Sequence, residues 1–318
     1  MNGAGVMDGS AGADFAHEPV MVQEIIDVFG PAPAGFIYDA TVGGAGHAHA
    51  ILSAHQHLSV LGVDRDAEAL QAAGRRLAEF GDRVRLQHRR FDDVDAALEE
   101  AGLNEVSGAL FDLGVSSFQF DTARRGFSYR FEAPLDMRMD ARENLTAAVI
   151  VNEWTEDEIT RVLQTYGDEK FARKIARQIV ASRPVTTTTE LAALVASAIP
   201  APARRRGGNP AKRTFQALRI AVNQELEILP QALDRVLAKT CSGGRVVVLA
   251  YHSGEDRLVK ERFTFHTTGG CTCPSHLPCG CGAQASARRL RVPSRPAQAE
   301  RDANPRSASA RMRAVEVL

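Results

Sequence analysis

The sequence contains no long hydrophobic run. Among its 318 residues no apolar stretch approaches the ~20 residues that a membrane-spanning helix needs. The first 16 residues are rich in glycine and alanine and lack the basic start and apolar stretch of a signal peptide, so we expect a flexible tail. With 44% hydrophobic and 24% charged residues, the chain is expected to fold as a soluble cytoplasmic protein of roughly two domains.

The sequence also lacks a large excess of charge of either sign, since the net charge is −1. The charges are nevertheless unevenly distributed along the chain. Residues 201–219 include six basic side chains and no acid, and eight arginines stand against three acids between residue 282 and the end. Such basic patches are typical of proteins that bind a polyanion. A solvated surface is the alternative for either patch alone.

Strand-like and helix-like segments alternate in the first part of the chain. Strands are predicted at 36–40, 59–64, 84–90 and 106–113, with helices at 45–54, 67–80 and 92–101. Helical spacing then dominates at 146–153, 156–165, 169–182, 188–198 and 211–238, with caps at Thr155 and Thr187. Strand signal returns at 244–250 and 311–317. The pattern predicts an α/β sheet that is interrupted by a helical insertion and completed at its edge by the tail strand.

Three of the predicted strands end in an acid: Asp39, Asp64 and Asp112. Open α/β sheets bind ligands at the carboxyl ends of their strands, and packing alone does not explain three acids there. The loop after Asp112 adds the hydroxyls of Ser116 and Ser117. We therefore predict a polar ligand site at this edge of the sheet.

A glycine-rich turn runs from Asp39 to His47, between a strand and a helix. It lacks the third glycine of the NAD fingerprint, because that position is His49, and it lacks the Lys-Ser/Thr pair of a phosphate loop. Asp64 ends the next strand, where a carboxylate suits the two ribose hydroxyls of a nucleoside. The combination indicates S-adenosylmethionine as the ligand, with a plain tight turn as the alternative.

Four of the five cysteines form a cluster, and Cys241 stands apart as an expected buried residue. Two Cys-x-Cys pairs can supply four thiolates to a structural zinc ion, although zinc sites more often use Cys-x-x-Cys spacing. Structural disulfides are not expected in the cytoplasm. A reduced loop over the substrate entrance is the alternative. The zinc hypothesis concerns Cys271, Cys273, Cys279 and Cys281.

The ordered motifs resemble those of the ribosomal RNA small subunit methyltransferase H family, also called MraW. The resemblance covers nearly the whole chain, and departures at Val42, Phe118 and Gly254 remove no proposed ligand group. The motifs lie at 17–20, 39–47, 64–66, 112–117 with Gln119, 125–128, 134–139, 166–169, 209–226, 252–257 and 304–307.

The resemblance implies a Rossmann-like S-adenosylmethionine-dependent methyltransferase with an inserted all-helical domain. Its reaction would be methylation of the exocyclic N4 of a decoding-centre (P-site) cytidine in 16S ribosomal RNA, on the 30S subunit. No membrane or DNA partner is expected, and a homodimer is left open. The implied parts are a tail (1–16), two methyltransferase segments (17–135 and 231–318, the latter with the Cys-rich loop 269–283) and the RNA-binding insertion (136–230).

Site residues follow from the strand ends, the helical spacing and the resemblance together. Cofactor binding is predicted for Gly43, Ala45, Gly46, His47, Asp64, Phe91, Asp112 and Gln119. RNA binding is predicted for Lys212, Arg213, Arg219 and Asn223, unless this helix surface lies over an acidic neighbour. The unranked catalytic candidates are Asp112, Ser116, Ser117, Asp136 and His252.

Two other functions compete with this prediction. The first is a binding protein that holds ribosomal RNA without chemistry, which the intact turn and the three strand-end acids disfavour. The second is a DNA amine methyltransferase, which the missing Asn/Asp-Pro-Pro-aromatic motif disfavours.

Overall fold

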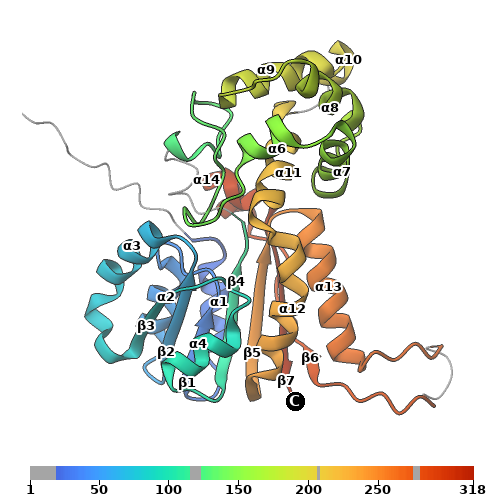
Figure 1. The fold of residues 1–318 in the computed structure, drawn as a ribbon. Coiled ribbons are helices and arrows are strands. Elements are labelled where there is room, and N and C mark those ends of the chain that lie inside the picture. The colour runs from blue at the N-terminus through green and yellow to red at the C-terminus, as the bar shows by residue number, and fades with distance from the viewer. Residues whose placement is uncertain (1–18, 115–122, 206–207, 275–279) are drawn as a thin grey trace, which may run out of the picture.

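The computed structural model describes residues 19–114, 123–205, 208–274 and 280–318. They form one seven-stranded sheet between two layers of helices, with further helices over one edge of the sheet (Figure 1). The strand order is β3-β2-β1-β4-β5-β7-β6, and β7 runs antiparallel to both of its neighbours. The strands are β1 Gly35–Asp39, β2 Leu58–Asp64, β3 Val84–His88, β4 Val106–Asp112, β5 Thr240–Ala250, β6 Ala287–Arg289 and β7 Arg311–Val317.

Helices cover both faces of the sheet. One layer contains α1 Val22–Phe29, α2 Gly46–Ala54 and α3 Ala67–Leu77. The other contains α4 Val94–Ala101, α12 Glu225–Ala238 and α13 Ser253–Thr268. Because both faces are covered, β4 is buried along almost its whole length, as expected for a parallel sheet. Short elements complete this part: α14 Gln298–Ala303 and the 3₁₀ turns η1 Ala78–Arg83, η2 Ala123–Arg125 and η3 Pro305–Ser309.

The remaining helices form a separate apolar core above the carboxyl edge of the sheet (Figure 1). Two of them begin with the predicted capping boxes, in which Thr155 pairs with Glu158 and Thr187 with Glu190. The core also includes side chains of the segment before α6. The helices are α6 Ala147–Glu153, α7 Glu156–Gly167, α8 Ala172–Ala181, α9 Thr188–Ala198, α10 Ala201–Arg204 and α11 Ala211–Asn223.

The α/β fold class is confirmed, but two details of the sequence prediction are wrong. The helix predicted at 211–238 is broken at Gln224, whose φ of 54° is left-handed, so α11 joins the helical core and α12 packs on the sheet. The tail strand β7 does not lie at the edge of the sheet, because β6 pairs with its other side. Across the described ranges, no helix is long and apolar enough to cross a membrane.

Candidate active site

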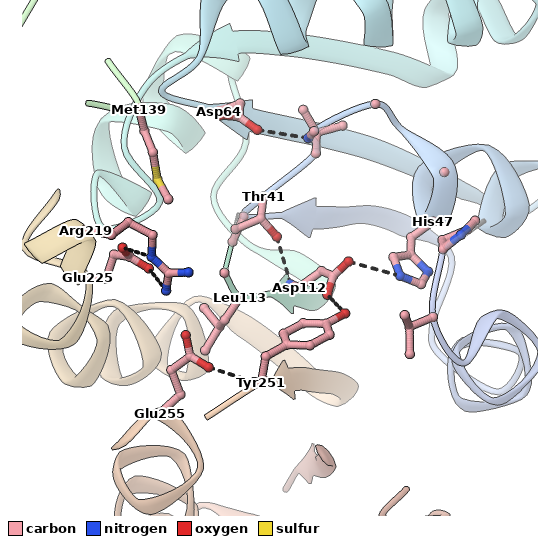
Figure 2. Close-up of a pocket in the computed structure, with 18 of the residues that line it drawn as sticks. Thr41, His47, Asp64, Asp112, Leu113, Met139, Arg219, Glu225, Tyr251 and Glu255 are labelled. Atoms are coloured by element: carbon pink, nitrogen blue, oxygen red, sulfur yellow. Dashed lines mark hydrogen bonds and ion pairs between the residues drawn. The ribbon is translucent and has the colours of Figure 1, made fainter. Parts of the chain in front are cut away.

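A cavity of about 620 Å³ lies at the carboxyl edge of the sheet, between the strand ends and the helical part. The three acids predicted from the sequence all line it: Asp39 ends β1, Asp64 ends β2 and Asp112 ends β4. Tyr251 lines it from the position directly after β5. Because β2, β1, β4 and β5 pair in parallel, their carboxyl ends lie side by side. Figure 2 labels the residues at three of these ends, which are Asp64, Asp112 and Tyr251.

The glycine-rich turn after β1 is held against Asp64. The N–H of Gly43 donates to Oδ2 of Asp64 at 2.9 Å, and the N–H of Asp66 donates to Oδ1 at 2.9 Å. Gly43 and Ala45 have positive φ values of 48° and 59°, which direct the chain into the start of α2. A Cβ on Gly44 would meet no atom within 4 Å, so the turn borders open space.

Burial perturbs two carboxyl groups in this wall. It raises the pKa of Asp39 to about 7 and the pKa of Asp64 to about 6, because a carboxylate loses hydration there. Backbone N–H groups that donate to these carboxylates partly oppose the rise. A ligand that donates hydrogen bonds to Asp64 would favour its ionised form.

Asp112 is fixed by groups from three elements (Figure 2). Its N–H donates to Oγ1 of Thr41 at 2.8 Å, its Oδ1 accepts from the hydroxyl of Tyr251 at 2.7 Å, and its Oδ2 lies 3.4 Å from Nε2 of His47. Burial, reinforced by the charge of Asp112, raises the pKa of Tyr251 well above its ordinary value, so its hydroxyl remains a donor. The side chain of Asp112 is still 21% exposed and is accessible from the cavity.

His252 lies in the N-terminal cap of α13 and is bound to Glu255. Its Nδ1 accepts from the N–H of Glu255 at 3.3 Å, and its Nε2 lies 3.0 Å from the Glu255 carboxylate. The same carboxylate accepts from the N–H of Tyr251 at 2.7 Å. Among the described residues, Glu255 and Tyr251 line the cavity and His252 does not. The cavity is therefore lined here by Tyr251, directly after β5, and by Glu255 in the first turn of α13.

Two arginines from different elements also line the cavity. Arg219 donates to both oxygens of Glu225, at 2.8 and 2.9 Å, in a largely buried ion pair. Arg65 is 8% exposed and donates to the carbonyl of Asn223 at 2.9 Å, with its guanidinium carbon 6.0 Å from the ring centre of Phe91. Arg219 therefore joins α11 to α12, and Arg65 joins the end of β2 to the end of α11.

The four residues predicted to bind RNA fall into two groups. Lys212 and Arg213 are exposed on α11, and Lys212 also lines the cavity. Asn223 is 6% exposed, and its amide makes 2.8 Å hydrogen bonds to the backbone of the segment 137–139. Arg219 is paired as described above. The polar side-chain atoms of Asn223 and Arg219 are therefore used inside the protein.

Asp136 lies outside this cavity, in a neighbouring cluster of charges. Its carboxylate accepts two hydrogen bonds from the guanidinium of Arg138, at 2.7 and 2.8 Å, and one from the backbone N–H of Arg138 at 3.0 Å. Burial acts to raise the pKa of Asp136, but the hydrogen bonds from Arg138 outweigh it, so the pKa is lowered. The structure therefore does not bring Asp136 to the strand-end acids. Ser116, Ser117 and Gln119 lie outside the described residues.

Sequence reasoning missed the wall formed by residues 128–131, between the sheet and α6. Ser128, Tyr129, Arg130 and Phe131 all line the cavity, and Phe131 is 53% exposed. Aromatic residues in an irregular segment have no periodicity that marks them as a site. Of the predicted cofactor positions, those that line the cavity are Gly43, Gly46, His47, Asp64, Phe91 and Asp112, while Ala45 is fully buried in the turn.

The fold and the cavity define a class of protein. The sheet has the order 3-2-1-4-5-7-6 with an antiparallel β7, a glycine-rich turn follows β1, and an acid at the end of β2 binds this turn. This combination defines a Rossmann-like methyltransferase that uses S-adenosylmethionine. Residues 14–318 match the MraW methylase family, and the chain belongs to that family.

Relatives of similar length support this assignment. A protein named Ribosomal RNA small subunit methyltransferase H from Mycobacterium sp. (strain KMS) is 50% identical over 321 residues, covering 96% of this chain and 85% of its own. Proteins of the same name from Symbiobacterium thermophilum and Heliobacterium modesticaldum are 50% and 47% identical, and each alignment covers 96% of this chain and at least 97% of the relative.

The residues present fit S-adenosylmethionine. The carboxylate of Asp64 can accept hydrogen bonds from ribose hydroxyls, and Phe91 offers an aromatic ring for the adenine in the same wall. One terminal nitrogen of Arg65 is buried without a hydrogen-bond partner among the described residues, so a polar group is still missing there. The volume of about 620 Å³ lies within the roughly 300–1,000 Å³ typical of small-molecule sites.

Proposed function

We propose that this methyltransferase modifies the exocyclic N4 of a decoding-centre cytidine at the P site of 16S ribosomal RNA, within the 30S subunit. Family membership and the names of full-length relatives support small-subunit ribosomal RNA as the substrate. The choice of cytidine N4 rests on the resemblance of the motifs. The observation that carries the proposal is one cavity that is lined both by the strand-end acids and by aromatic and basic side chains, among them the exposed Phe131, Arg130 and Lys212.

The chemistry at the cavity is chiefly a matter of position. When bound, S-adenosylmethionine supplies a methyl group on a sulfonium, and the cytosine nitrogen takes this methyl as the carbon–sulfur bond breaks and the amine loses a proton. The amine is a poor nucleophile, because its lone pair is delocalised into the ring. A carboxylate that accepts a hydrogen bond from the amine would direct the lone pair toward the methyl group and take the proton.

Asp112 is the best placed of the described candidates for this role. It lines the cavity at the end of β4, and Thr41 and Tyr251 fix both its backbone and its carboxylate. Asp136 is instead paired with Arg138 in the neighbouring cavity. We therefore assign Asp112 the contact with the cytosine amine, and Asp64 the contact with the ribose of the cofactor.

The RNA base must be unstacked before it can enter the cavity. Tyr129 and Phe131 are placed to stack on it from the wall that faces the helical part, and Tyr129 is itself steadied by an edge-to-face contact with Phe215 at 5.6 Å. Lys212 and Arg213 lie on the exposed side of α11, where they can neutralise phosphates. We propose that the helical part predicted at 136–230 carries most of the RNA contact.

Methyl transfer to defined substrates tests this proposal. Purified 30S subunits from cells that lack the modification, naked 16S RNA and single-stranded DNA would each be incubated with labelled S-adenosylmethionine. We expect label in the 30S subunits and none in the DNA. Label in the DNA, or no label in either RNA sample while the cofactor binds normally, would contradict the proposed substrate.

A further inference from the structure

Beyond α13 the chain forms a loop whose two ends are held together. The N–H of Ser286 donates to the carbonyl of His266 at 2.9 Å, and the ring of His266 lies 2.9 Å from Oγ of the same serine. Gly269 follows the helix with a φ of 62°, and a Cβ there would lie 2.3 Å from the carbonyl oxygen of Gln284. Only glycine fits so close an approach, so the loop leaves and returns at one point.

The described part of this loop has no apolar core of its own. Among the described residues from 270 to 286, not one is buried. Ordering each residue of a chain costs about 1–2 kcal/mol of conformational entropy, which burial of apolar side chains normally offsets. Another interaction is therefore needed to hold this segment in one conformation.

Three thiols converge inside the loop. The Sγ atoms of Cys271, Cys273 and Cys281 all lie within 4.8 Å of one another, although up to ten residues of sequence separate them. The N–H of Cys273 donates to Sγ of Cys271 at 3.4 Å. Zinc–sulfur bonds of about 2.3 Å in a tetrahedron place neighbouring sulfurs about 3.8 Å apart, so the observed spacing needs little adjustment. An N–H that donates to a sulfur also stabilises the thiolate form that metals bind.

We propose that Cys271, Cys273 and Cys281 bind one structural zinc ion. Thiolate ligands select soft or borderline metals, and zinc commonly occupies closed, cysteine-rich structural sites. Each ligating thiol loses its proton to solvent on binding, and no oxidation takes place. Cys279 lies outside the described residues, so the proposal rests on the other three thiols.

The position of the loop gives the metal a structural role. Glu255 in the first turn of α13 lines the active-site cavity, whereas Cys271 follows the last turn. A helix of 16 residues is about 24 Å long, and Figure 1 shows the loop at the end of α13 that is remote from the helical part. The ion would therefore tie the described segments 270–274 and 280–286 to α13 without contacting the reacting groups. This placement also argues against a loop that covers the substrate entrance.

Metal analysis of the full-length protein, purified without chelator, tests the proposal. We expect about one zinc ion per chain in the wild type and loss of that zinc in both Cys273→Ser and Cys281→Ser. Cys241→Ser is the matched control, because Cys241 lies in β5 outside the cluster, and it should retain the metal. Replacement of zinc by cobalt should give the visible absorption bands of tetrahedral cobalt thiolate in the wild type and the control alone.

Three outcomes would overturn the proposal: a wild-type protein without zinc, zinc that both serine variants retain, or a disulfide between two of these cysteines in protein purified under reducing conditions. Affinity for S-adenosylmethionine serves as the check on folding, since the loop is remote from the cavity and both serine variants should bind it normally. Removal of zinc from the wild type should speed proteolysis within 270–286 while leaving this affinity unchanged. A loss of affinity on zinc removal would contradict the structural role.

Discussion

Replacement of Asp64 by asparagine should weaken the binding of S-adenosylmethionine by about 10- to 150-fold. The proposed contact joins a carboxylate to ribose hydroxyls, and hydrogen bonds to a charged group are worth about 1.5–3 kcal/mol. Each 1.4 kcal/mol corresponds to about a tenfold change in Kd. Asparagine keeps the shape of the side chain and can still accept from the N–H of Gly43, so the glycine-rich turn should survive. Calorimetry at pH 7.5 would measure the change.

The pH dependence of the same affinity separates the charge of Asp64 from its shape. Burial raises the pKa of Asp64 to about 6, so the ionised form that accepts from ribose is lost as the pH falls through 6. The wild-type Kd should therefore rise below pH 6 and level off above pH 7. In Asp64→Asn this rise should disappear, and any pH dependence left over reports on Asp39, whose pKa is about 7. The exposed Asp82→Asn is the control. An Asp64→Asn variant with wild-type affinity and an unchanged pH profile would refute the assignment.

Three further predictions concern other parts of the site. Tyr251→Phe removes the hydroxyl that donates to Asp112 at 2.7 Å, so kcat should fall about tenfold or more while cofactor affinity and circular dichroism stay normal; an unchanged kcat would remove this contact from the mechanism. Asp39→Asn should gain stability relative to the wild type as the pH rises from 5 to 8. The reason is that Asp39 has a pKa of about 7 in the folded protein, so the wild type loses stability over that range. A difference in Tm between the two proteins that does not vary with pH would contradict this prediction. Lys212→Ala should reduce the salt dependence of RNA binding by about one counterion, whereas Lys170→Ala, an exposed lysine away from the cavity, should not; equal salt slopes would place the RNA elsewhere.

The sheet could be predicted because each central strand is a short apolar run that ends in a polar turn. The break between α11 and α12 could not, because Gln224 takes a left-handed conformation that the sequence marks with neither glycine nor proline. The position of β7 inside the sheet was also missed. Its partner β6 is only three residues long and includes two arginines, so it shows no strand pattern.

The candidate site was predictable where chemistry coincides with a strand end. Asp39, Asp64 and Asp112 line the cavity for this reason. The sequence could not distinguish His252 from its neighbour Tyr251, because the choice depends on which of two adjacent residues faces the cavity. It also could not show that Asn223 is enclosed by the segment 137–139, since helical spacing alone placed it beside exposed cations.

The proposed reaction is methyl transfer to the exocyclic amine of one cytidine, and nucleoside analysis of the reaction product tests it most directly. After reaction with the 30S subunit, the 16S RNA would be cleaved into defined fragments, digested to nucleosides and analysed by chromatography with mass spectrometry. The account predicts N4-methylcytidine in a single fragment from the decoding centre, and its absence when Asp112→Ala replaces the wild type. A methyl group on the ribose, on the ring carbon of cytosine or on another base would contradict it.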